Sequence, residues 1–209
     1  SNGYESMIYI AWATVLAGFI FSRNSAITLA ATGVLSGLIL FVAHLNWLDP
    51  QVTNLVPVLQ SYWLSIHVSM ITASYGFLAL GALLGFISLI LFALRSKKSS
   101  RRINLSISEL NTINEMSLIV GLVLLTVGNF LGGVWANESW GRYWGWDPKE
   151  TWALIVWLVY GAYLHARVSH GWHGKALAWW AVAGFLVTIF CFLGVNMYLS
   201  GLHSYGRLT

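Results

Sequence analysis

Long apolar runs alternate with short polar segments along the 209 residues of this chain. An α-helix needs about 20 apolar residues to cross the hydrocarbon core of a bilayer. Six runs approach that length, and we interpret them as six membrane-spanning helices. The first and fifth runs are short, which thinning of the bilayer or flanking aromatic rings would accommodate. The predicted spans are Met7–Phe21, Ala26–Leu45, His67–Leu94, Ile113–Trp135, Thr151–Ala166 and Ala176–Leu199.

The overall composition supports a lipid environment. Hydrophobic residues make up 57% of the chain and charged residues only 9%, whereas soluble domains keep about a quarter of their residues charged. We therefore expect an all-α integral membrane protein, a bundle of about six transmembrane helices forming a single domain over residues 1–209. Cys191 is the only cysteine, which excludes a disulfide within the chain. We interpret Cys191 as a small residue in helix packing or lipid.

The distribution of basic residues predicts an orientation. If the six spans alternate, eight of the 11 Lys and Arg residues fall on one side. The positive-inside rule puts that side in the cytoplasm and both ends of this chain outside. Because those charges lie in membrane-flanking loops, the net charge of +4 does not indicate nucleic-acid binding. The eight are Arg23, Arg95, Lys97, Lys98, Arg101, Arg102, Arg167 and Lys175.

A tryptophan-rich loop, Asn137–Glu150, is predicted on the outer face between the fourth and fifth spans. An aromatic belt at the membrane surface accounts for tryptophans, but not for the interleaved Gly141 and Gly145, which permit tight turns. We expect these turns to tilt Trp140, Trp144 and Trp146 toward one centre. Such a platform suits a flat, apolar ligand such as a porphyrin or a quinone. Arg142 and Lys149 are then placed to meet carboxylates on its edge.

Asp147 has a structural interpretation as well. The run Asp147-Pro-Lys-Glu150 reads as an N-cap followed by proline at the first helical position and glutamate at the third. This is a variant of the capping box. We therefore expect Asp147 to start the fifth helix, with direct ligand contact as the alternative.

The same residues carry a family resemblance. Trp140-Gly-x-x-Trp144-x-Trp146-Asp147 resembles the WWD signature of haem-handling proteins, and the continuation to Trp152 is similar to the CcsA/ResC branch of System II cytochrome c maturation. The resemblance covers essentially the whole chain. It implies the binding of haem b (iron protoporphyrin IX), its transport across the membrane, and its presentation on the outer face. There it would be attached by thioether bonds to the CxxCH motif of apocytochrome c.

Haem iron accepts two axial ligands, and a neutral imidazole is a common one. His67, at the outer end of the third span, and His203, just after the sixth, match the family's outer axial ligands. The alternative is that both face water and lipid headgroups. His165 lies near the inner end of the fifth span, about 27 Å of helix from Asp147 at 1.5 Å per residue. The family implies an inner iron-ligand role for His165, with snorkelling beside Arg167 as the alternative.

The resemblance also implies partners and a location. It implies holocytochrome c synthase (haem lyase) activity together with a CcsB/ResB partner, apocytochrome c as substrate, and thiol-reducing thioredoxin-like proteins, with no nucleic acid involved. The membrane is a bacterial inner membrane or a thylakoid membrane. The six spans and the start at Ser1 without an initiator Met suit the C-terminal part of a fused partner–CcsA polypeptide. Two alternatives stay open: a CcmC-like haem donor to a chaperone, and a b-type or quinone-binding electron-transfer subunit.

Overall fold

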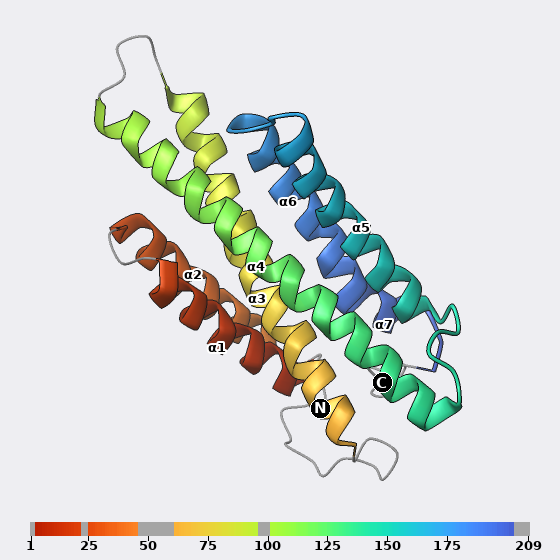
Figure 1. Ribbon diagram of the computed structural model, residues 1–209. Helices are drawn as coiled ribbons and strands as arrows, with labels where there is room; N and C mark the ends of the chain where they lie inside the picture. Colours follow the sequence, from red (N-terminus) through yellow and green to blue (C-terminus); the bar gives the residue numbers. More distant parts are fainter. Residues whose placement is uncertain (1–2, 22–24, 46–60, 96–100, 203–209) are drawn as a thin grey trace.

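The computed structural model describes residues 3–21, 25–45, 61–95 and 101–202, and within these ranges all regular structure is helical. The outer axial ligand candidate His203 lies outside the described residues. Long helices run side by side along one direction, and successive helices reverse (Figure 1). The elements are α1 (Gly3–Phe21), α2 (Ala26–Ala43), α3 (Tyr62–Leu94), α4 (Arg101–Trp140), α5 (Pro148–Ser169), α6 (Lys175–Ile189), the π-helix η2 (Phe190–Gly194) and α7 (Val195–Tyr198).

The helices form three neighbouring pairs. The pair α1 and α2 lies on one side, the two longest helices α3 and α4 occupy the centre, and α5 with α6 lies on the other side (Figure 1). Helix α3 packs against α1, α4 and α6 and so connects all three pairs. Its middle is accordingly buried, with Leu78, Leu80 and Leu84 inaccessible to solvent. Outward-facing residues such as Phe41 and Phe130 are instead exposed and apolar, as expected for side chains that meet lipid.

Membrane-crossing length is met by most of these helices. Among the described residues, five helices are long and apolar enough to cross a membrane, namely α1, α2, α3, Ile103–Trp140 within α4, and Lys175–Tyr198. The 22-residue α5 is not among them, because its Trp, Tyr and His residues and Arg167 lower its mean hydropathy. It nevertheless runs alongside α6, on the side of the bundle away from α1 and α2 (Figure 1). The chain is a multi-pass, all-α integral membrane protein.

The predicted boundaries of the fourth span were too narrow. Apolar character predicted Ile113–Trp135, whereas α4 contains 40 residues from Arg101 to Trp140. Hydropathy indicates which part of a helix lies in lipid, but it does not indicate where the helix begins. The polar turns before Ile113 are helical, although they are not apolar. Since α4 continues to Trp140, the loop predicted at Asn137–Glu150 is in fact confined to residues between Trp140 and Pro148.

The two ends of the bundle differ in character. We call the end that carries Arg95, Arg101, Arg167 and Lys175 the basic end, and the opposite end, where α5 begins, the Trp-loop end. Figure 1 places the start of α1, the start of α3 and the connection from α4 to α5 together at the Trp-loop end. The candidate ligand His67 and the Trp loop are therefore at the same end, and His165 is at the other.

Candidate functional site at the Trp-loop end

His67 lies in the second turn of α3 and faces α4. Its Nδ1 is 2.7 Å from the carbonyl oxygen of Gly128. A carbonyl oxygen only accepts, so Nδ1 carries the proton and donates it, which places the lone pair of the imidazole on Nε2. Histidines that ligate metals characteristically donate their other ring N–H to a carbonyl or carboxylate in this way. The hydrogen bond therefore holds His67 in the tautomer that ligates a metal through Nε2.

Glycines on α4 allow the close approach of His67. A Cβ atom built on Gly132 would lie only 2.7 Å from Cε1 and 2.8 Å from Nδ1 of His67. One turn earlier, a Cβ on Gly128 would lie 2.6 Å from Cδ1 of Ile71. Small residues let helix backbones approach closely in membranes. The glycines thus bring the α4 backbone within hydrogen-bonding distance of the imidazole.

His67 opens onto a cavity of about 90 Å³. Sites that enclose a whole ligand typically occupy about 300–1,000 Å³, so this cavity has room for only part of a large ligand. The Trp loop contributes Tyr143 and Trp144 to its wall, which gives the cavity aromatic surface beside an imidazole. The other lining residues come from α3, α4, α5 and η2, and are Ile71, Tyr75, Asn129, Gly132, Gly133, Lys149, Glu150, Ala153 and Cys191.

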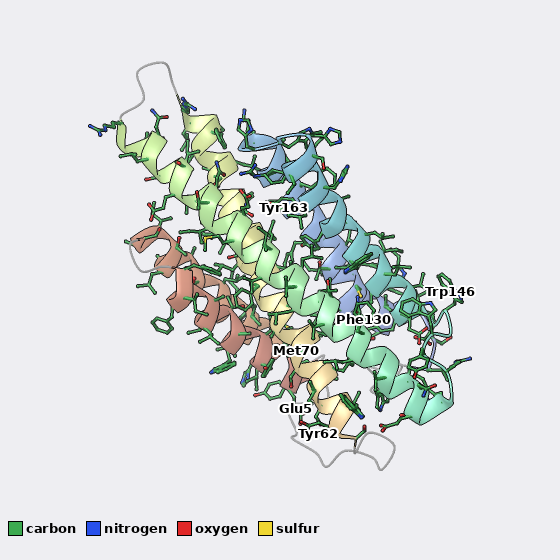
Figure 2. All side chains as sticks on the ribbon, viewed as in Figure 1. Glu5, Tyr62, Met70, Phe130, Trp146 and Tyr163 are labelled. Atoms are coloured by element: carbon green, nitrogen blue, oxygen red, sulfur yellow. The ribbon has the colours of Figure 1, made fainter. Side chains whose placement is uncertain are left out.

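The tryptophans of the loop do not share one centre, contrary to the expectation of a single platform. Trp140 packs edge-on against the buried Trp135, with ring centroids 4.7 Å apart. Trp144 lines the cavity and meets Trp146 edge-on at 5.8 Å. Trp146 itself is 69% exposed and projects from the bundle where α5 begins (Figure 2). Of the three signature tryptophans, Trp144 is therefore the one that the structure brings to the cavity of His67.

Backbone turns in the loop only partly follow the glycines. Gly141 has φ +69°, as expected of a residue that turns the chain directly after α4. Gly145 instead makes room for the side chain of Arg142, because a Cβ atom on Gly145 would lie 2.6 Å from Cζ of Arg142. The second left-handed residue is Trp146, with φ +58°. A bulky residue rarely adopts this conformation. The loop thus holds the Trp146 ring outward at some cost in backbone strain.

Asp147 starts α5, and the prediction of a capping box is confirmed. The Asp147 carboxylate accepts a hydrogen bond from the Lys149 backbone N–H at 3.0 Å. Glu150 supplies the reciprocal hydrogen bond of the capping box, since its Oε2 accepts from the backbone N–H of Asp147 at 3.2 Å. The same oxygen also accepts from the backbone N–H of Gly145 at 2.7 Å. Glu150 therefore ties the loop to the first turn of the helix. Asp147 is 7% exposed and is not among the residues that line the cavity.

Lys149 has a different environment from the predicted one. Its ammonium group donates to the carbonyl oxygens of Cys191 at 2.7 Å and Phe192 at 3.2 Å, and to Oδ1 of Asn196 at 2.9 Å. Both carbonyls belong to η2, where the wider π-helical turn interrupts the regular pattern of α-helical hydrogen bonds. Burial lowers the pKa of Lys149 from its usual value. The hydrogen bonds of its ammonium group join α5 to the last helix. They occupy the donors that the sequence had suggested would bind a carboxylate of the ligand.

Two cavity residues were missed by the sequence interpretation. Tyr75 of α3 and Cys191 of η2 both line the cavity and are buried, and the Tyr75 hydroxyl lies 3.8 Å from the Cys191 sulfur. Cys191 was expected to be a packing residue, which is correct as far as its burial goes. The available signal was the spacing of Tyr75, which lies two turns after His67 and so shares its side of a helix.

At the basic end, His165 lies in the last turn of α5 and is exposed. Its ring is 5.4 Å from that of His170, and Ser169 Oγ lies 3.3 Å from its Nδ1. Tyr163, two residues earlier, is 2% exposed and is labelled within the bundle in Figure 2. Arg167 forms an ion pair with Glu115 of α4 at 2.8 Å. His165 thus faces out of this bundle, on a different side of α5 from Tyr163.

Comparison with known proteins assigns the family. The cytochrome C assembly protein family matches residues 1–203. The chain belongs to this family. It is 51% identical to the protein NrfI of Wolinella succinogenes over 99% of this chain. It is 42% identical to the cytochrome c biogenesis protein CcsA of Chlamydomonas reinhardtii over 99% of this chain, and 39% identical to that of Guillardia theta over 100%.

The relatives differ in how much of their length this chain covers. The chain spans 23% of NrfI and 60% of the Chlamydomonas protein, but 77% of the Guillardia protein. The expected likeness to CcsA-type cytochrome c biogenesis proteins is confirmed by these matches.

Proposed function

We propose that this chain carries haem across the membrane and holds it at the Trp-loop end for covalent attachment to apocytochrome c. The observation that carries the proposal is His67, whose Nδ1–H is held by the Gly128 carbonyl beside a cavity walled by Tyr143 and Trp144. Nε2 of His67 is one axial ligand of the haem iron, and His203 is the other. The Trp-loop end faces the outer side of the membrane, and the basic end faces the cytoplasm.

The donor set of the cavity suits haem as its substrate. An imidazole with its proton on Nδ1 is a common iron ligand, and the aromatic rings of Tyr143 and Trp144 offer stacking surface to a flat macrocycle. Arg142 is exposed on the same loop, where its guanidinium meets a propionate at the edge of the substrate. Trp140 packs against the buried Trp135 and is not among the residues that line the cavity.

Attachment requires little of the protein beyond positioning. The cysteine thiols of a CxxCH motif add across the two vinyl groups of haem: each S–H bond and the π bond of one C=C break, and one C–S and one C–H bond form. Electrons balance without an added oxidant or reductant. The chain contributes orientation of the vinyl edge toward the peptide, which converts an encounter into a near-unimolecular step. Thioredoxin-like proteins keep the cysteines of the substrate reduced, as thiols.

At the basic end, His165 ligates haem on its way in. Because His165 faces outward from this bundle, its second iron ligand comes from outside the described residues, and a CcsB/ResB portion, fused or separate, supplies it. Holocytochrome c synthase activity belongs to the two portions together. The shares of the relatives covered by this chain are compatible with such a fusion, since it spans only 23% of NrfI.

The proposal is tested by purifying the native polypeptide with its partner and recording absorbance spectra of the oxidised and reduced states. Wild-type protein should copurify with six-coordinate, low-spin haem. His67→Ala and His203→Ala should each lose that signature, and added imidazole should restore it. His44→Ala is the matched control, since His44 is an exposed histidine that ends α2. If both variants keep the wild-type spectrum, the bis-histidine assignment is wrong.

A further inference from the structure

A polar cavity of about 440 Å³ lies at the basic end of the bundle. Residues of α3, α4, α5 and α6 line it, and Tyr163, labelled in Figure 2, lies on its α5 side. Charged and polar side chains line the cavity together with the apolar Phe92, Ile107 and Leu177. A wall with both kinds of surface suits an amphiphilic ligand, whose polar group and apolar part each find a partner. We call this space the basic-end cavity.

Asn114 of α4 gives the basic-end cavity a buried acceptor. The side chain lines the cavity and is 2% exposed, and its Oδ1 has no hydrogen-bond partner among the described residues. The amide nitrogen packs against α3, since a Cβ atom on Gly85 would lie 2.9 Å from Nδ2. A buried polar atom without a partner is unfavourable for folding. A ligand that donates an O–H or N–H to Oδ1 would remove this cost.

Positive charge borders the same cavity. Arg95 lies exposed where α3 ends, and Nε of Arg167 forms the ion pair with Glu115 at 2.8 Å. A guanidinium carries five N–H donors, so this ion pair leaves Arg167 with donors for a second anion. Two arginines and one glutamate line the cavity, which gives it a charge of +1 when His173 is neutral.

Helix α6 also begins at the basic-end cavity. Its N-cap is Gly174, which has φ +61° and no side chain that could cap the first amides of the helix. Gly174 and Leu177, in the first turn, both line the cavity. The backbone amides and the dipole at a helix N-terminus favour an anion. Cationic side chains and a helix N-terminus therefore border one cavity that also holds an unpartnered acceptor.

The depth of the cavity matches that of lipid headgroups. The 33 residues of α3 correspond to about 50 Å of helix at 1.5 Å per residue, whereas the hydrocarbon core is about 30 Å thick. Helix α3 thus extends about 10 Å beyond the core at each end when it is centred. From Gly85, which contacts Asn114, to Arg95 is about 15 Å of helix. The cavity therefore reaches from the headgroup layer at Arg95 to the edge of the hydrocarbon at Asn114.

We propose that the basic-end cavity binds the headgroup of an anionic phospholipid, with phosphatidylglycerol as the fitting chemistry. The phosphate lies between Arg95, Arg167 and the first turn of α6, and a hydroxyl of the glycerol headgroup donates to Oδ1 of Asn114. The apolar part of the wall meets the beginning of the acyl chains. Basic pockets between transmembrane helices are known to bind anionic headgroups. A choline headgroup has no such donor. This inference does not depend on the haem proposal.

Two variants with matched controls test the two kinds of contact. Asn114→Leu removes the acceptor at nearly constant volume. Its control is Ser117→Ala, because Ser117 is equally buried on α4 and its Oγ has no partner in the described part of the chain, but it does not line the cavity. Arg95→Gln removes a lining charge. Its control is Arg101→Gln, because Arg101 is exposed at the same end and does not line the cavity.

The experiment uses the full polypeptide with its partner, delipidated in detergent. Its Tm is measured against added phosphatidylglycerol, phosphatidylcholine and water-soluble glycerol phosphate. Only phosphatidylglycerol should raise the wild-type Tm saturably. Its apparent affinity should fall about tenfold in Arg95→Gln and about two- to tenfold in Asn114→Leu, and stay at the wild-type value in both controls. Without lipid, Asn114→Leu should melt no lower than wild type, because it removes an unpartnered buried acceptor.

Each other outcome overturns the proposal. An equal rise in Tm with phosphatidylcholine would show a general effect of lipid, and an equal rise with glycerol phosphate would assign the cavity to a soluble phosphate ester. Wild-type affinity in both Asn114→Leu and Arg95→Gln would show that the lipid binds elsewhere, as would equal losses in the controls. Haem that copurifies should be unchanged in Asn114→Leu; loss of haem with phosphatidylglycerol affinity retained would assign the cavity to haem instead.

Discussion

Substitution of Gly132 by alanine tests the packing that orients His67. The added methyl group would lie 2.7 Å from Cε1 and 2.8 Å from Nδ1 of the imidazole, whereas carbon atoms in contact prefer about 3.5–4.0 Å. Either the ring or α4 must move by about 1 Å to restore a normal contact. The 2.7 Å bond from Nδ1 to the Gly128 carbonyl then lengthens beyond a good hydrogen bond.

The expected effect is large on haem and moderate on folding. Overpacking costs about 1–3 kcal/mol, which a bundle of this size tolerates. Loss of the partner that orients a metal-ligating histidine typically costs about 10- to 100-fold in affinity. We therefore expect Gly132→Ala to fold, insert, and bind haem about 10- to 100-fold more weakly, as measured by absorbance titration of the purified complex.

A matched control is available on the same helix. A Cβ on Gly121 would lie 2.7 Å from Cδ2 of Leu78, so Gly121→Ala creates an equal overlap at the same α3–α4 interface, two to three turns away from His67. It should cost similar stability and leave haem affinity within about twofold, because no iron-ligating or hydrogen-bonding group is displaced. Equal haem affinities in the two variants would refute the view that Gly132 orients His67.

Three further predictions concern the Trp loop. Trp144→Ala should weaken haem binding severalfold, whereas Trp146→Ala should leave it nearly unchanged, since Trp144 lines the cavity and Trp146 does not. Titrations in which the two variants lose the same haem affinity would contradict this. Glu150→Ala removes the acceptor of two backbone N–H groups and should lower the free energy of unfolding by about 1.5–3 kcal/mol, seen as a lower Tm that Glu150→Gln partly restores. Trp146→Gly should keep or raise the Tm, because glycine adopts φ +58° without strain and the lost ring is largely exposed; a marked decrease would show that the ring stabilises the fold.

Sequence reasoning recovered the helices better than their ends. Long apolar runs have few alternatives in a chain this poor in charge, so all six segments were placed. The 40-residue α4 was underestimated because residues before Ile113, such as Asn104, Ser108 and Asn111, are polar. They are nevertheless helical, and Asn111 and Glu115 point with Tyr163 and Arg167 into a polar cavity at the basic end. A hydropathy pattern cannot separate such turns from a loop.

The sequence predicted those contacts of the site that join residues close together in the chain. The two residues of the cap, Asp147 and Glu150, are only three positions apart, so the sequence alone specified it. The partners of Lys149 are 42 to 47 residues away, and a π-helix leaves no simple compositional signal. The direction of each tryptophan likewise depends on a loop backbone in which Trp146, and not the neighbouring glycine, takes the positive φ. Contacts of this kind follow only from the assembled fold.

The π-helix η2 has a consequence for the spacing of residues in the chain. An α-helix turns about 100° per residue, and a π-helical turn accommodates one residue more than an α-helical one. Deleting a single residue from Phe190–Gly194 would let the helix close as a regular one. Because the wide turn absorbs that residue, the residues after it would keep nearly the same direction. The carbonyls of Cys191 and Phe192, which accept from Lys149 in this turn, would instead be drawn into regular α-helical hydrogen bonds. The extra residue therefore presents backbone acceptors to a cation from another helix, a contact that substitutions in η2 should leave in place and that a deletion should remove.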